Sequence, residues 1–283
     1  MNAVLRLEAH LGRKADAIIP FEAGGVNSTL PLLIGARMGL PVIDGDGMGR
    51  AFPELQMETF AVYGVPASPM VVVNEWGDSV VVQARTNQMT EWLARGTTIR
   101  MGGQTSIAEY SMDGATAKRV SIPGTMTLAR QIGGCLREAR AQHRDPFAAL
   151  IELLPGTHYR FGKILFQGKI VDVARATRQG FAIGRALIQG LDDWNGTLEI
   201  TFQNENLIAR IDGEVKAIVP DLICILDSET AEPITTEWLR YGQRVTAMGV
   251  SVPEIMRSPE ALAIFGPAAF GLDEPFTPLE TLL

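Results

Sequence analysis

The chain has 283 residues, of which 46% are hydrophobic and 20% charged, a composition typical of a globular protein and not of a disordered one. Its formal net charge of −7 argues against a nucleic-acid binder, which normally carries a basic face. No apolar run approaches the length that spans a bilayer, and the N-terminus shows no secretory signal. Two cysteines, Cys135 and Cys224, cannot by themselves build a disulfide framework or a zinc site. We therefore expect a soluble, cytoplasmic protein with no nucleic-acid or membrane partner.

The first 95 residues are predicted to form an α/β domain. Short apolar runs at 17–21 and 41–44 are expected to be strands, and a helix is expected between them, ending at Gly39. A second helix is expected from Pro53 to about Tyr63. This order of strand, helix, strand and helix is typical of a layer with a mostly parallel sheet.

Two local signals refine this first domain. Asn27 or Ser28 is placed to cap the first helix, and Pro31 then falls in its first turn, where the missing N–H costs little. The valine-rich runs at 70–73 and 80–82 are predicted to form a hairpin.

Residues 96–155 are predicted to be a helical connecting region that completes the first domain. Apolar residues at helical spacing predict helices over 87–95, 125–142 and 146–154.

Beyond residue 155 the pattern changes to short β runs, at 163–166, 197–202, 206–209 and 222–226. The turn pairs Asn195-Gly196 and Asp212-Gly213 separate some of them and are strong hairpin signals. We predict a second, β-rich domain over residues 156–283, either a barrel or a swivelling β domain.

The segment with most chemical potential is the turn from Asp44 to Arg50, which contains three glycines and two aspartates after a predicted strand. In an extended chain Asp44 and Asp46 point to the same side, so they could converge on one target. Two carboxylates so close persist in ionised form when a cation, Arg50 or several amides compensate them. A calcium loop fits poorly, because Met48 stands where an oxygen ligand is required. The alternative is an acidic turn held by Arg50 and nearby amides.

Glu22, Gly24 and Gly25 follow the first predicted strand in the same way. A glycine-rich turn that leads into a helix presents free N–H groups, which would suit a carboxylate, an imide oxygen or a phosphate. No dinucleotide fingerprint or P-loop lysine is present, so no nucleotide cofactor is expected. A helix cap with a tight turn explains the same residues, Asn27 included.

In the predicted β-rich domain, four consecutive polar side chains, from Gln203 to Asn206, interrupt the β pattern after Phe202. They either form a hairpin turn or bind the donors and acceptors of a substrate.

Several of these runs together resemble the S-methyl thiohydantoin desulfurase family, long catalogued as a domain of unknown function found with hydantoinase and oxoprolinase proteins. The resemblance is carried by residues 22–28 and 41–57, and by later segments at 168–173, 202–207, 220–223, 241–245 and 266–271. It covers most of the chain, and it implies an α/β first domain followed by a β-rich one.

The resemblance implies a hydrolase-like enzyme that replaces the S-methyl group of a hydantoin-type ring by oxygen. Asp44 and Asp46 would then activate water, or bind a divalent metal if one is present, and Arg50 would stabilise developing negative charge. Glu22, Gly24, Gly25 and Asn27 would contact the substrate, and Asn204 and Glu205 would bind the N–H and C=O groups of the ring.

One departure from the family concerns the start of the chain. Family members begin with a further glycine-rich segment, upstream of the point where this resemblance starts. That segment includes a strand, and without it an edge of the sheet would be uncovered, which favours association into a homo-oligomer. Two alternatives stay open: an enzyme that opens a related cyclic amide, and a non-catalytic small-molecule-binding subunit that partners a hydantoinase-like enzyme.

Overall fold

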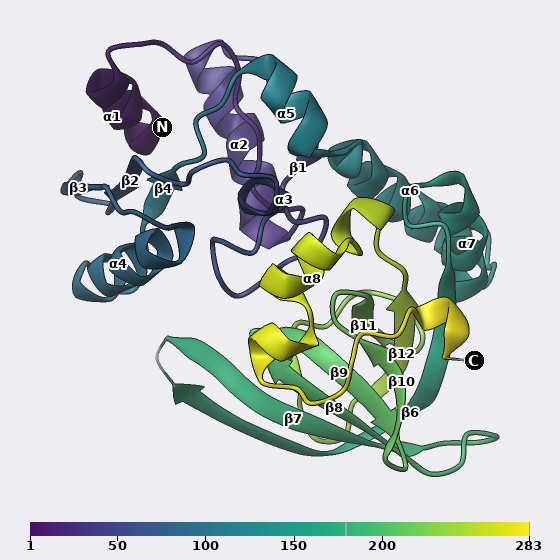
Figure 1. Ribbon diagram of the computed structural model, residues 1–283. Coiled ribbons are helices and arrows are strands. Elements are labelled where there is room, and N and C mark those ends of the chain that lie inside the picture. Colours follow the sequence, from purple (N-terminus) through teal and green to yellow (C-terminus); the bar gives the residue numbers. More distant parts are fainter. Residues whose placement is uncertain (179, 283) are drawn as a thin grey trace. The chain divides into compact units, whose positions relative to one another are not determined.

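The computed structural model describes residues 1–178 and 180–282 (Figure 1). The chain divides into two compact units, Met1–Met126 and Thr127–Leu283, and each has its own hydrophobic core. No helix in the described ranges is both long enough and apolar enough to cross a membrane.

The first unit contains a three-stranded antiparallel sheet in the order β3-β2-β4. Its strands are β2 (Met70–Val73), β3 (Ser79–Val82) and β4 (Ser106–Ala108). The central strand β2 is buried along its whole length because both of its faces are covered. One face packs against Ala3 and Leu7 of α1 (Asn2–Leu11), and the other packs against the cluster that includes Ala94 of α4 (Asn87–Arg100). The predicted hairpin is confirmed.

The prediction of a mostly parallel sheet is wrong. The runs at 17–21 and 41–44 do lie parallel, but they share a single isolated bridge between Ile18 and Val42. In the part of the chain that the structure describes, every pairing between named strands is antiparallel. Each of the two runs contains a proline, Pro20 or Pro41, which has no N–H to donate to a longer ladder.

Two helices of the first unit differ from their predicted bounds. Helix α2 (Gly25–Met38) begins earlier than predicted, with Gly24 at its N-cap position and no side-chain cap. Pro31 therefore lies inside the helix and not in its first turn. Its end at Gly39, which has a φ of 67°, is as predicted. Of the helix predicted from Pro53 to Tyr63, only α3 (Thr59–Val62) is formed.

The remaining elements of the first unit lie close to the site described below. They are β1 (Gly45–Asp46), β5 (Ile122–Pro123) and α5 (Gly114–Val120). Strand β1 pairs with β5, and a Cβ on Gly45 would lie 2.8 Å from the carbonyl oxygen of Ile122, so this close pairing requires glycine.

The helices predicted over 125–142 and 146–154 are confirmed as α6 (Thr125–Ala141), which begins two residues before the second compact unit, and α7 (Pro146–Leu153), which lies within that unit. They are followed by a seven-stranded antiparallel half-barrel in the order β10-β9-β8-β7-β6-β12-β11. Its strands are β6 (Gly162–Arg178), β7 (Phe181–Gly190), β8 (Thr197–Gln203), β9 (Glu205–Ile211), β10 (Glu214–Ile218), β11 (Leu222–Asp227) and β12 (Arg244–Val250).

The half-barrel confirms the prediction of a β-rich region. Asp212 and Gly213 join β9 to β10 with φ values of 48° and 90°, the two positive angles that a tight hairpin turn of type I′ needs. The amide of Asn206 on β9 donates to the carbonyl oxygen of Ile223 on β11 at 2.8 Å. This bond links strands that stand far apart in the sheet order, as the curl of the half-barrel allows.

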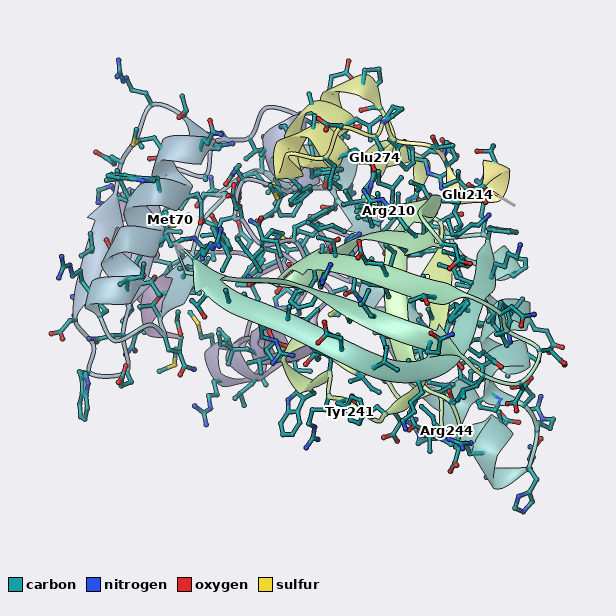
Figure 2. The ribbon with its side chains drawn as sticks, turned by 90° about the horizontal axis from the view of Figure 1, so that it is seen from below. Met70, Arg210, Glu214, Tyr241, Arg244 and Glu274 are labelled. Atoms are coloured by element: carbon teal, nitrogen blue, oxygen red, sulfur yellow. The ribbon has the colours of Figure 1, made fainter. Side chains whose placement is uncertain are left out.

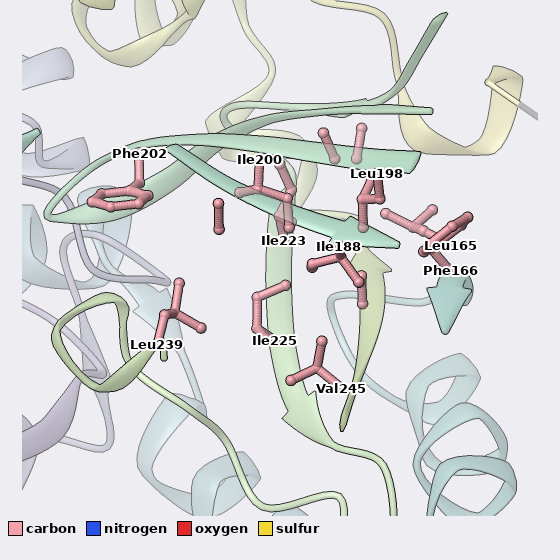
Figure 3. Close-up of a cluster of buried hydrophobic side chains, with 14 of the residues drawn as sticks. Leu165, Phe166, Ile188, Leu198, Ile200, Phe202, Ile223, Ile225, Leu239 and Val245 are labelled. Carbon is pink, nitrogen blue, oxygen red and sulfur yellow. The ribbon is translucent and has the colours of Figure 1, made fainter. Parts of the chain in front are cut away.

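Alternate residues of β8 supply the core of the half-barrel. Leu198, Ile200 and Phe202 are fully buried and belong to the same core cluster as Ile223 and Ile225 of β11 (Figure 3). Burying each such side chain contributes about 1.5–3 kcal/mol. The alternation of buried and partly exposed residues along β8 is the period of two expected for a sheet with one covered face.

The C-terminal segment is tied to the half-barrel by ion pairs. Arg210 of β9 pairs with Glu274 (Figure 2), and Arg257 bridges Asp221 and Glu280. The same segment holds the short helix α8 (Pro259–Phe265) and the 3-10 turns η3 (Glu254–Met256), η4 (Pro267–Phe270) and η5 (Leu279–Thr281).

Candidate functional site

The turn from Asp44 to Arg50 is largely interior, because every residue from Gly45 to Arg50 is buried. Its two aspartates have different surroundings. Asp44 is exposed, and its Oδ1 accepts the N–H of Met126 at 3.0 Å. Asp46 is fully buried, and its Oδ1 accepts the N–H groups of Met48 and Gly49 at 2.7 and 2.5 Å. Asp46 therefore belongs to a buried site, whereas Asp44 faces solvent.

Two further carboxyl groups lie in the interior with Asp46. Glu58 directly precedes α3 and is fully buried, and Glu109 follows β4 with both of its carboxyl oxygens buried. Neither carboxyl group accepts or donates a hydrogen bond within the described residues. Burial raises the pKa of Glu58 well above its ordinary value, and the charges of Glu109, Asp46 and Glu22 raise it further. Burial likewise raises the pKa of Glu109, with Glu91 as the next cause.

We call Glu22, Asp46, Glu58 and Glu109 the buried carboxyl cluster. Burial also raises the pKa of Asp46, although hydrogen bonds from the Thr125 side chain and from the amides of Gly49 and Met48 oppose this effect. These four residues come from four separate segments of the chain, and only the fold of the first unit brings the other three within electrostatic range of Glu58.

Gly47 holds the turn directly against Glu58. A Cβ on Gly47 would lie 2.5 Å from Oε2 of Glu58 and 2.9 Å from Cε2 of Phe60. The N–H of Thr59 also donates to the carbonyl oxygen of Gly47 at 2.6 Å. The absence of a side chain at position 47 therefore lets the backbone of the turn pack on the Glu58 carboxyl group.

Glu22 connects the cluster to the surface. Its side chain is 7% exposed, and its Oε1 accepts the amide of the exposed Asn27 at 2.5 Å. Gly24 packs against Glu22, since a Cβ there would lie 3.5 Å from the carboxyl carbon, and Gly25 is exposed with a φ of 46°. The prediction that Asn27 or Ser28 caps helix α2 is therefore wrong: the helix has no side-chain cap, and the Asn27 amide binds Glu22 instead.

Arg50, the cation of the turn, is 6% exposed. Its Nε donates to the carbonyl oxygen of Ala51 at 3.1 Å, and its guanidinium lies over the ring of Phe52, 4.9 Å from the centroid. These contacts hold the guanidinium in the interior of the first unit beside the turn.

Tyr110 and Glu91 extend the polar region beyond the cluster. The Tyr110 hydroxyl donates to the carbonyl oxygen of Leu55 at 3.2 Å, and Glu91 accepts the N–H of Leu55 at 3.3 Å and pairs with Arg95. Burial raises the pKa of Tyr110, and the charges of Glu58, Glu109 and Glu91 raise it further, so this phenol stays protonated. Unlike Glu58, Glu91 has a cation beside it.

Metal binding was left open by the sequence. Within residues 1–178 and 180–282, no three His, Cys, Asp or Glu side chains are grouped as metal ligands would be.

The two candidate residues of the second unit lie at the turn between β8 and β9. Asn204 has a φ of 55°, its Oδ1 accepts the N–H of Ala182 at 2.8 Å, and its own N–H donates to the Ala182 carbonyl oxygen at 2.8 Å. Its side chain thus stabilises the turn, as the hairpin interpretation of this segment requires. Glu205 is partly buried and opens β9, opposite Gln203.

Sequence reasoning missed Glu58 and Glu109. Glu58 directly follows the run from Pro41 to Met57 that carried the family resemblance, and Glu109 stands between Ala108 and the aromatic Tyr110. An acidic residue in an apolar stretch is a signal in itself, because Glu is rarely buried without a partner. The prediction of a helix over 53–63 hid this signal at Glu58, since a helix would have given it a polar face.

The comparisons with known proteins cover nearly the whole chain. Residues 1–84 match the family description "S-Me-THD-like, N-terminal domain", and residues 85–279 match "S-Me-THD-like, C-terminal domain". These two matches meet within the first compact unit, which extends to Met126. A crystal structure of a protein from Chromobacterium violaceum is similar with a TM-score of 0.79 and 23% identity, over 98% of this chain and 78% of that one. At this identity the likeness shows the fold. No curated protein matches the chain.

Proposed function

Because the chain belongs to the S-Me-THD-like family through both of its domains, we propose that it is an enzyme that hydrolyses an S-methyl thiohydantoin. The reaction replaces the methylthio group on a ring carbon by oxygen: a C(SCH3)=N unit and water give a C(=O)–NH unit and methanethiol. The observation that carries this proposal is the Glu58 carboxyl group, fully buried and without a hydrogen-bond partner among the described residues.

The reaction needs an acid, and Glu58 suits this role. Burial raises its pKa and so favours the protonated carboxyl group, which is the state in which it can give a proton to the ring nitrogen. Protonation of the C=N unit makes the ring carbon electron-poor, so that water can add to it. A carboxylic acid in ordinary solvent would have lost this proton.

Asp46 supports the second half of the reaction. Its Oδ1 is held by two backbone amides, and Oδ2 is the oxygen that would take a proton from the attacking water. When the C–S bond breaks, its electron pair goes to sulfur and the proton on Asp46 completes methanethiol. The remaining hydroxyl proton returns to Glu58 as the carbonyl forms, so both residues regain their starting state. Arg50 and the amides near Gly24 and Gly25 would stabilise negative charge on the ring oxygen.

The test is release of methanethiol from an S-methylated 2-thiohydantoin by the purified full-length chain, followed with a thiol reagent. We expect Glu58→Gln to lower kcat by about 100-fold or more, since positioned acid–base catalysis contributes 10²–10⁴-fold. Glu75→Gln is the matched control, because Glu75 is exposed in the loop between β2 and β3.

Three results would overturn the proposal. Equal turnover by the wild type and Glu58→Gln would remove Glu58 from the mechanism. A ring-opened carbamoyl acid in place of thiol would identify a cyclic-amide hydrolase. Tight binding of the ring without any product would identify a non-catalytic binding subunit.

A further inference from the structure

We infer that the buried carboxyl cluster selects ligands with a basic N–C–N unit, such as cyclic guanidines and isothioureas, over neutral cyclic amides of the same shape. The inference uses the proposed function only to locate the site. It goes beyond that function because it names a wider class of ligand and a rule of discrimination.

The buried carboxyl cluster has more hydrogen-bond acceptors than donors. Both carboxyl oxygens of Glu58 and of Glu109 are buried and accept no hydrogen bond from any described residue. A buried polar group left without a hydrogen bond destabilises the folded protein. Such a group persists when something else satisfies it, and a ligand that carries several N–H donors would satisfy these oxygens together.

Three members of the cluster also have no cation paired with them. Among the ion pairs of the described residues, none includes Asp46, Glu58 or Glu109. The nearby charges that act on Glu58 are all negative, those of Glu109, Asp46 and Glu22. Arg50 is buried beside the turn, but none of these ion pairs joins a cation to Asp46, Glu58 or Glu109, so a positive ligand charge would be their direct partner.

The chemistry of the ligand follows from these two arguments. A basic N–C–N unit offers two parallel N–H donors, the geometry with which guanidinium groups bind carboxylates. A neutral isothiourea can take its proton from Glu58, which leaves an ion pair in the interior. A cyclic urea or hydantoin presents a carbonyl oxygen in place of one N–H donor. That oxygen can accept the Glu58 proton, but the ring brings no positive charge and leaves more of the buried carboxyl oxygens without a donor. A site built for one pattern of hydrogen bonds strongly rejects ligands that cannot form this pattern.

The test uses two unreactive rings of the same size, 2-aminoimidazoline and imidazolidin-2-one, a cyclic guanidine and a cyclic urea. Binding to the full-length protein is measured by titration calorimetry at neutral pH, in two buffers with different ionisation heats. We expect the guanidine to bind at least about tenfold more tightly, with release of roughly one proton, because a bound cation displaces a carboxyl proton. The cyclic urea should release none.

Variants test whether Glu58 causes the selectivity. Glu58→Gln should lower the affinity for 2-aminoimidazoline by about tenfold or more and abolish proton release, whereas the control Glu75→Gln should change neither. If Glu58→Gln fails to fold, Glu109→Gln and the two-ring comparison on the wild type still decide the question.

Equal affinities for the two rings, or a guanidine affinity that Glu58→Gln leaves unchanged, would overturn the inference. Thiol release from an S-methyl thiohydantoin without this selectivity would overturn it too, and would leave the proposed function standing. Selective binding without thiol release would support the inference and overturn the proposed function instead.

Discussion

At the scale of single residues, the cluster depends on how closely the backbone of the turn packs against Glu58. Glu58 receives neither a cation nor a hydrogen bond from the described residues, so it is positioned by packing alone. A Cβ on Gly47 would lie 2.5 Å from a carboxyl oxygen of Glu58 and 2.9 Å from the ring of Phe60, so the turn packs closely against both side chains.

Gly47→Ala tests this packing. The added Cβ would lie 2.5 Å from the Glu58 carboxyl group and 2.9 Å from Phe60, so we expect a loss of about 1–3 kcal/mol in the free energy of unfolding and a strong loss of turnover. The control is Gly96→Ala in α4, where nothing lies within 4 Å and alanine favours the helix, which should stabilise the protein by about 0.5–1 kcal/mol. Urea unfolding measures both, and equal effects would contradict this account.

The residue scale also shows what the turn motif could reveal in advance. The pattern of carboxylates among glycines drew attention to Asp44 and Asp46, and the family resemblance supported it. Whether each aspartate faces inward depends on the pairing of β1 with β5 and on the donor at Met126, which lie far along the chain. Neither partner could be read from the local pattern.

At the scale of elements, the start of β11 is joined to the C-terminal segment by one buried carboxylate. Asp221 is fully buried and accepts the N–H groups of Val252 and Leu279 as well as the guanidinium of Arg257, at 2.8–2.9 Å. Arg257 also binds Glu280. The three donors come from separate segments, so this carboxylate fixes the path of the chain after β12.

Arg257→Gln should destabilise the second unit by about 3–5 kcal/mol, because it leaves the Asp221 charge buried without its cation. Arg185→Gln provides the comparison, since Arg185 pairs with Glu199 at 3.6 Å on the surface and its loss should cost about 0–1 kcal/mol. Thermal or urea unfolding of the two variants measures the difference. A cost below about 1 kcal/mol for Arg257→Gln would show that the network is not structural.

Elements with strong local signals were predicted well. The helices α6 and α7, the β2–β3 hairpin and the Asp212-Gly213 turn follow from spacing, caps and turn residues that lie within the element itself. The helix expected over 53–63 failed because the side chain of Glu91 and the carbonyl oxygen of Gly47 bind residues 55 and 59 from outside the segment.

At the scale of the whole molecule, the carboxyl groups whose pKa is shifted in the folded protein form two sets, and these sets make stability depend on pH in opposite directions. Burial raises the pKa of one set, which comprises Asp46, Glu58, Glu91, Glu109 and Asp221. The other set has lowered pKa values and comprises Glu8, Asp113, Asp227, Glu274 and Glu280.

The raised set contributes stability that is complete below the unfolded pKa values and is lost as the pH rises through the folded ones. The lowered set contributes stability that is present above the unfolded pKa values and is lost as the pH falls through the folded ones. We therefore expect the free energy of unfolding, measured in urea, to be higher at about pH 5 than at about pH 8, and to fall below about pH 4. The double variant Glu58→Gln and Glu109→Gln should flatten the alkaline limb, whereas stability that rises from pH 5 to pH 8 in the wild type would contradict the assignment.

The amino-acid sequence by itself determined the family, the β-rich C-terminal region and the elements whose signals are local, because caps, turn residues and apolar spacing act over a few residues. Only the tertiary structure decided that the first unit lacks the mostly parallel sheet expected within its described residues, since strand direction there depends on which distant segments pair. It also decided that Glu58 and Glu109 join Asp46 while Asp44 faces solvent. Burial and electrostatic range are properties of segments that meet in space, so no local pattern contains them.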